Sequence, residues 1–102
     1  MTQPVFLIIN ATANRQEPEA HDEYLKRSAP ISAQYGAVKV ANYCLTETLD
    51  DQAMPEHCLV VSFPTRQSIF DLFSDPEYLA LIKLRNLGFE AIRYFIGSET
   101  IG

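Results

Sequence analysis

The chain has 102 residues, 47% of them hydrophobic, and its 13 acidic residues outnumber the 8 basic ones to give a net charge of -5. This length and composition predict a single globular domain over residues 1–102. Nucleic acid is not expected as a partner, because phosphate binding needs a basic face and no cluster of lysines or arginines occurs. No apolar run approaches the roughly 18 residues of a membrane span, and no signal-peptide pattern opens the chain, so no membrane partner and a cytoplasmic location are expected.

Two stretches have the pattern of central strands. Val5 to Ala13 reads VFLIINATA, and Leu59-Val60-Val61 lies in the short apolar stretch that leads to Pro64. Neighbouring side chains of a strand point to opposite faces, so apolar residues at successive positions predict burial on both faces. We therefore expect both stretches in the middle of a sheet.

An amphipathic helix is expected after the first strand. Pro18 suits the first helical position, acidic residues fill the opening turns, and Gly36 is a natural stop after Tyr35. Pro30 should kink this helix. Residues 37–49 alternate less cleanly and predict a partly exposed edge strand, followed by a hairpin loop over residues 50–56.

A second helical region precedes the last strand. Residues 65–73 predict a helix capped by the threonine at its start. The spacing from Ser74 to Glu77 is that of a capping box, which predicts a further helical segment reaching residue 87. Residues 89–96 predict the final strand.

The order strand, helix, strand, strand, helix, strand predicts an α+β, ferredoxin-like βαββαβ fold. Right-handed crossovers place both helical regions on one face of a four-stranded antiparallel sheet, with the first and third strands in the centre. The other face of those central strands is also apolar, and exposing a large apolar side chain costs about 1.5–3 kcal/mol. We therefore expect a homodimer through the open sheet face.

Arg85 is expected to interrupt an apolar stripe. At about 100° per residue it projects beside Leu81 and Tyr78, where an unpaired charge is costly. One interpretation is structural: the guanidinium pairs with a carboxylate or a backbone carbonyl, or its stem reaches to water. The alternative is an anion anchor that binds a small anionic or aromatic ligand in a cleft between helices and sheet.

Other polar residues could complete such a cleft. Tyr24 and His21 project inward from the first helix and are candidate acid or base residues, whereas Tyr78 is a candidate ligand-binding residue. Asn10 and Asn42 lie on strands and could line the same cleft. Each also has a structural interpretation: tyrosines of the core with satisfied hydroxyls, a partly exposed histidine, and asparagines that form strand-edge hydrogen bonds.

The cysteines and histidines give little indication of a disulfide or of a metal site. A hairpin centred near Ala53 would place Cys58 opposite Thr48 and away from Cys44, which predicts two reduced core thiols. No HxxxH, paired CxxC or His-carboxylate cluster at ligand spacing occurs, so no metal site is expected.

Five segments carry a recognisable pattern over nearly the whole chain: Glu17–Tyr24, Gln34–Gly36, Val60–Pro64, Ser74–Tyr78 and Leu84-Arg85. Together they resemble a small bacterial family, domain of unknown function 1330. The resemblance implies membership of the dimeric α/β barrel group, with its ferredoxin-like fold and a homodimer, and no particular reaction. His21, Ser62 and Ala37 depart from the residues common in the family.

Two functions follow as hypotheses. The first, which rests on the relatives, is a cofactor-independent enzyme, monooxygenase-like or isomerase-like, acting on a small oxygenated metabolite. Arg85 would then be the anion anchor, with His21 or Tyr24 as acid or base. The second is a non-catalytic ligand-binding or stress-associated dimer, in which the same cleft binds without turnover or is filled by side chains. Whether the protein is an enzyme is left open at this point.

Overall fold

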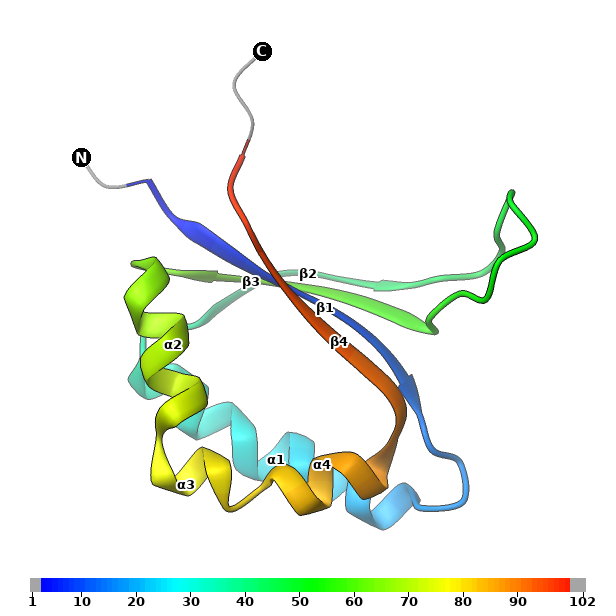
Figure 1. Cartoon of the computed structure of the whole chain (residues 1–102), viewed down its shortest axis with the longest axis horizontal. Helices are drawn as coiled ribbons and strands as arrows, with labels where there is room; N and C mark the ends of the chain where they lie inside the picture. The colour runs from blue at the N-terminus through cyan, green and yellow to red at the C-terminus, as the bar shows by residue number, and fades with distance from the viewer. Residues whose placement is uncertain (1–2, 100–102) are drawn as a thin grey trace.

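The computed structural model describes residues 3–99, and all of its helices lie on one side of a single antiparallel sheet (Figure 1). The strand order is β2-β3-β1-β4, so the first and third strands are central, as predicted. This confirms the α+β, ferredoxin-like fold. The elements are β1 (Val5–Ala13), α1 (Pro18–Gln34), β2 (Val38–Cys44), β3 (His57–Phe63), α2 (Arg66–Ser74), α3 (Pro76–Leu79), α4 (Ile82–Gly88) and β4 (Phe89–Gly97).

The first helix ends where the sequence predicts. α1 runs through Pro30 and stops one residue before Tyr35. Gly36 follows with a φ of 86°, in the left-handed region that favours glycine, and a Cβ there would lie 2.6 Å from Cγ of Pro64. The Gly36 stop is therefore fixed both by backbone conformation and by the close approach of the turn after β3.

The second helical region differs from the prediction. Thr65 caps α2 in a capping box with Ser68, but Asp75, rather than Ser74, caps the segment behind it by accepting from the Glu77 amide at 2.7 Å. Asp75 precedes a proline, which disfavours a helical backbone at that position and makes it the cap. The single segment expected to residue 87 is instead two short helices, α3 and α4.

The second strand is shorter than predicted, and its register differs. It ends at Cys44 instead of residue 49, and residues 45–56 form a long loop. Thr48 and Asp50 bond to each other and to nearby backbone amides, which competes with strand pairing. Cys58 consequently pairs with Tyr43 and not with Thr48. Both cysteines are free, but Cys44 is exposed, so the prediction of two core thiols is wrong for that residue.

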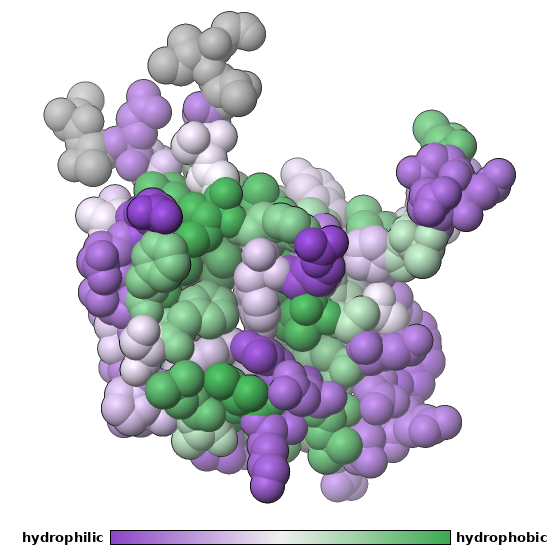
Figure 2. Space-filling view, viewed as in Figure 1, coloured by the Kyte–Doolittle hydropathy of each residue, from purple (hydrophilic) through white to green (hydrophobic). Residues whose placement is uncertain are grey.

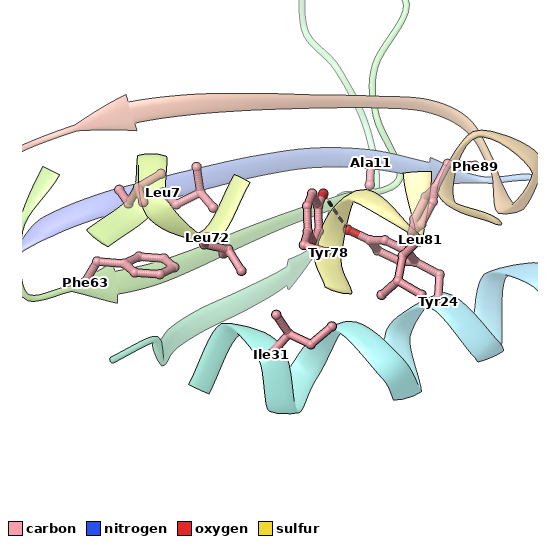
Figure 3. Packing of buried hydrophobic residues seen from close by; sticks show 10 residues of the cluster. Leu7, Ala11, Tyr24, Ile31, Phe63, Leu72, Tyr78, Leu81 and Phe89 are labelled. Atoms are coloured by element: carbon pink, nitrogen blue, oxygen red, sulfur yellow. Dashed lines mark hydrogen bonds between the residues drawn. The ribbon is translucent and has the colours of Figure 1, made fainter. Parts of the chain in front are cut away.

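The core fills the space between the sheet and the helices (Figure 3). Strand alternation points Leu7 and Ala11 of β1 into this layer, with Phe63 of β3 beside them. The helices supply the opposite wall. Their buried side chains are Tyr24 and Ile31 of α1, Ile69 and Leu72 of α2, Tyr78 of α3, and Leu81.

The opposite face of the sheet is apolar and has no helix over it within residues 3–99. Ile8 of β1 pairs with Val60 of β3 and with Phe95 of β4, and all three alternate with helix-facing neighbours. Figure 2 shows hydrophobic side chains gathered along the crossing strands on the side away from the helices. We refer to this surface, centred on Ile8, Val60 and Phe95, as the open face. Its apolar character agrees with the prediction made from the central strands.

Candidate functional site

Three tyrosine hydroxyls meet inside the layer between helices and sheet. The Tyr24 hydroxyl of α1 lies 3.0 Å from that of Tyr78 on α3 and 3.2 Å from that of Tyr94 on β4. The Tyr78 and Tyr94 hydroxyls are 3.4 Å apart. Figure 3 shows the Tyr24 and Tyr78 rings converging from two helices beneath β1. Three elements that are distant in sequence thus place their phenols in one cluster.

Arg85 joins this cluster from α4. Its Nη1 donates to the Tyr78 hydroxyl at 2.9 Å, and its guanidinium carbon lies 5.5 Å from the centre of the Tyr94 ring. The Nε–H of Arg85 is buried and has no acceptor among residues 3–99. No carboxylate of that range forms a salt bridge with it. A buried donor without an acceptor costs about 1–3 kcal/mol, so this group is the most unusual polar atom of the site.

The cluster favours protonated phenols beside a charged guanidinium. Burial and the neighbouring tyrosines raise the pKa of Tyr24 well above its ordinary value. Burial and the proximity of Tyr78 raise the pKa of Tyr94 in the same direction. Burial opposes the charge of Arg85, but its hydrogen bond to Tyr78 and the adjacent hydroxyls outweigh that effect and raise its pKa. The site therefore offers hydrogen-bond donors at neutral pH, and neither Tyr24 nor Tyr94 is suited to act as a base.

Above pH 10 the protein is expected to lose stability. Tyr24 and Tyr94 ionise near pH 10 in the unfolded chain but at higher pH when folded, so the unfolded state binds fewer protons above that point. The contribution of each tyrosine is complete below pH 10 and declines above it by about 1.4 kcal/mol per pH unit. Urea unfolding followed by circular dichroism at increasing pH measures this slope.

The matched variant for this prediction is Tyr24→Phe, which removes one ionisable group and keeps the ring. Its slope above pH 10 should be shallower than that of the wild type by about 1.4 kcal/mol per pH unit. An equal slope in the two proteins would contradict the buried, protonated state of the Tyr24 hydroxyl.

An aromatic shell holds the cluster in place. Phe73 of α2 packs edge-on against both Tyr78 and Tyr94, with ring centres 5.0 Å apart in each case. Phe89, the first residue of β4, packs edge-on against Tyr24 at 5.7 Å. These rings fix the phenols through packing, which positions their hydroxyls for binding.

The structure brings together only part of the predicted site. Tyr24, Tyr78 and Arg85 meet, as their helical positions indicate. His21 instead contacts the Asp22 carboxylate at 3.0 Å and packs at a tilt against the Phe89 ring, with no hydrogen bond to the cluster.

The two asparagines do not line the cleft. Asn10 pairs with Cys58 and Arg93 and lies on the open face, because it alternates with the helix-facing Ala11. Asn42 is exposed on the edge strand β2. Sequence reasoning placed both near the ligand, and the alternation of β1 could have excluded Asn10.

Tyr94 is the member that sequence reasoning missed. It pairs with Ile9, which faces the same side of β1 as Leu7 and Ala11, and both of these are buried on the helix side. The alternation of β4 predicts that Ile92 and Tyr94 share one face, but it does not say which face meets the helices. The pairing with β1 decides this.

The two main surface grooves of the described chain lie elsewhere. One of about 460 Å³ lies between α1 and the α3 region, with Ile31, Gln34 and Glu77 in its wall. The other, of about 360 Å³, is lined by Asn14, Arg15, Gln16 and Glu90. Neither groove is lined by Arg85 or the clustered tyrosines.

The sequence comparison identifies the family. Residues 4–96 match the family described as "Domain of unknown function (DUF1330)". The chain belongs to this family. The match confirms the resemblance seen in the sequence, and it covers both helical regions, the first three strands and β4 apart from its last residue in this DUF1330 protein. None of the curated proteins matches the chain.

Solved structures with the same fold have little sequence identity to this DUF1330 protein. A protein of unknown function from Rhodopseudomonas palustris is 16% identical with a TM-score of 0.78, and the alignment covers 100% of this chain and 86% of that one. SnoaB, a cofactor-independent oxygenase from Streptomyces nogalater, is 12% identical with a TM-score of 0.69, covering 98% and 96%. A nipsnap family protein with unknown function from Agrobacterium tumefaciens is 12% identical with a TM-score of 0.62, covering 96% and 89%. At these identities the similarity shows the fold alone.

Two further observations concern residues 3–99. No helix in this range is both long enough and apolar enough to cross a membrane. The same residues contain no group of three or more His, Cys, Asp and Glu side chains that could hold a metal ion.

Proposed function

We propose that this DUF1330 protein is a homodimeric, cofactor-independent enzyme that acts on a small oxygenated metabolite at the cluster of Arg85, Tyr24, Tyr78 and Tyr94. The observation that carries this proposal is the buried Nε–H of Arg85, which has no acceptor in the described chain. A buried charged donor beside a cluster of protonated phenols is complementary to a carboxylate or enolate oxygen. The fold shared with a cofactor-independent oxygenase supports the reaction class by analogy.

Each residue of the cluster has its own role in this proposal. Arg85 holds the negative oxygen of the ligand, and Tyr78 orients the guanidinium through their 2.9 Å hydrogen bond. Tyr24 and Tyr94 donate to a second ligand oxygen and stabilise negative charge on it. The raised pKa of Tyr24 keeps its hydroxyl protonated at neutral pH, so Tyr24 serves as a hydrogen-bond donor to the ligand. His21 makes no hydrogen bond to this cluster, and we assign it no step.

The homodimer forms through the open face. Its apolar side chains lie at the centre of the sheet, and a second copy is the simplest cover for them. Both cysteines are free, which fits the reducing cytoplasm where we place the protein. Sedimentation of the wild type at micromolar concentration should give the mass of two chains, and a monomer there would refute the dimer.

Tyrosine fluorescence can test the site directly. The chain has no tryptophan and five tyrosines, three of which form the cluster, so a ligand there should change the emission. We expect small carboxylates and enolisable carbonyl compounds to bind, and Arg85→Met to weaken binding about tenfold through the loss of a charge-assisted hydrogen bond. Arg66→Met removes an arginine that lies over Phe70, outside the cluster, and should not alter affinity.

Turnover separates the proposed enzyme from the second candidate, a non-catalytic binding dimer. The burial of Tyr78 and Tyr24, which are 2% and 6% exposed, favours the second candidate. The two surface grooves described above favour it too, because no residue of the cluster lines either of them. Oxygen uptake, or exchange of a ligand proton with deuterated water, that Arg85→Met and Tyr24→Phe both reduce would establish the enzyme. Binding that requires Arg85 without any turnover would establish the binding dimer, and equal affinity of Arg85→Met and the wild type would refute both.

A further inference from the structure

The loop between β2 and β3 is an arm that leaves the body of the molecule. It comprises residues 45–56, far longer than the two to five residues of most hairpin loops. Figure 1 shows it projecting beyond the helices and rising on the side of the sheet that they leave uncovered. A loop of this length without secondary structure is uncommon in a compact domain, and such loops are usually functional segments or linkers. We refer to residues 45–56 as the arm.

The base of the arm is anchored to the body. The Leu45 amide donates to the Glu56 carbonyl at 2.8 Å, and the Glu56 amide donates to the Ala11 carbonyl at 3.1 Å. The Glu56 carboxylate accepts from the Ala13 amide at 3.0 Å and pairs with Arg15. These bonds set the direction in which the arm leaves the sheet.

The tip of the arm also has a defined shape. Asp50 accepts from the Gln52 amide at 3.1 Å, and its own amide donates to the Thr48 hydroxyl at 3.3 Å. Asp51 adopts a positive φ of 59°. Between these turns Leu49 is 99% exposed, and Figure 2 shows hydrophobic atoms at the tip of the arm beside hydrophilic ones. A locally ordered tip that presents a leucine to solvent suits an anchor for another surface.

Charge indicates which surface the arm meets. The arm carries Glu47, Asp50 and Asp51, and none of these forms a salt bridge with a residue of the described chain. On the open face, exposed Arg93 lies over the Phe95 ring at 4.7 Å and likewise has no carboxylate partner there. An acidic arm with an apolar tip therefore complements a basic and aromatic patch of the same chain. Arm and patch belong to the same side of the sheet.

We propose that the arm clasps a second copy of this chain, with Leu49 packed on the partner's Phe95 and the arm's acidic side chains facing the partner's Arg93. The inference rests on the proposed homodimer. In a two-fold symmetric dimer the arm of each chain contacts the patch of the other chain, so both arms are buried at the same time. The arm then extends the interface beyond the open face.

Sedimentation equilibrium of four variants tests the clasp. Leu49→Asp should weaken dimerisation about tenfold or more, because it places a charge in an apolar contact beside other acids. The matched control is Leu25→Asp, which introduces the same charge at an exposed leucine of α1 in the helix layer, and it should dimerise like the wild type. Arg93→Glu should also weaken the dimer, and adding Glu47→Lys with Asp51→Lys should restore part of the loss.

A cross-link gives a direct readout. With both native cysteines changed to serine, Leu49→Cys combined with Phe95→Cys should yield a disulfide-linked dimer under mild oxidation. If Leu49→Asp dimerises like the wild type and no cross-link forms, the clasp is refuted, even where a charge on the open face still disrupts the dimer. A wild type that is monomeric refutes the clasp and the proposed homodimer together.

Discussion

Tyr78→Ala is expected to lower the free energy of unfolding by about 3–5 kcal/mol, the range observed when a large buried aromatic side chain is removed. Tyr78 is 2% exposed and packs against Phe73 and Tyr24. Its hydroxyl also accepts from Arg85, so truncation leaves a cavity and a second unsatisfied guanidinium donor. Urea unfolding at one fixed protein concentration measures the change and keeps any dimer contribution constant.

Two further variants show which part of the Tyr78 side chain accounts for the decrease in the free energy of unfolding. Tyr78→Phe keeps the ring and removes the acceptor of Arg85, and it should cost about 1–3 kcal/mol. Phe70→Ala removes an aromatic ring of α2 that is 42% exposed, and it should cost about 1 kcal/mol or less. A loss for Tyr78→Ala no larger than for Phe70→Ala would show that α3 does not close the core.

Val60→Asp is expected to weaken dimerisation at least a hundredfold. Val60 lies on the central strand β3 and pairs with Ile8 and Ala41, so its side chain is near the middle of the open face. In a symmetric interface each subunit contributes one carboxylate to an apolar contact, and desolvated like charges cost several kcal/mol. Analytical ultracentrifugation over a range of concentrations measures the shift from dimer to monomer.

The matched control introduces aspartate on the helix side. Leu87→Asp lies at an exposed position of α4, remote from the open face, and it should leave the dissociation constant unchanged. Far-ultraviolet circular dichroism must show both variants folded for the comparison to count. If Val60→Asp remained fully dimeric, the open face would not be the interface.

Local sequence patterns predicted the helix-borne half of the site. The helical period places Tyr24, Tyr78 and Arg85 on inward stripes, and all three meet. The strand-borne half was less accessible to this reasoning. Tyr94 enters the cluster because β4 pairs with β1 in one particular register, and Asn10 is carried to the other face by the same alternation.

The remaining differences between the predicted and the observed structure concern the loop after β2 and the position of His21. A hairpin centred near Ala53 was predicted from the polar residues between two apolar runs. The actual strand ends at Cys44, because local hydrogen bonds of Thr48 and Asp50 hold the loop in its own conformation. This moves Cys58 opposite Tyr43 and produces the arm. His21 is inward in phase, yet its ring rests on Phe89 beside the cluster rather than within it.

The sequence by itself determined the order of strands and helices, the two central strands and the inward position of Arg85, because each of these follows from spacing within a few turns of chain. Only the tertiary structure decided that three phenols from α1, α3 and β4 share hydrogen bonds, that the Arg85 Nε–H has no acceptor, and that the arm rises on the uncovered side of the sheet. Those features depend on strand register and loop geometry between distant segments, and local periodicity does not encode either.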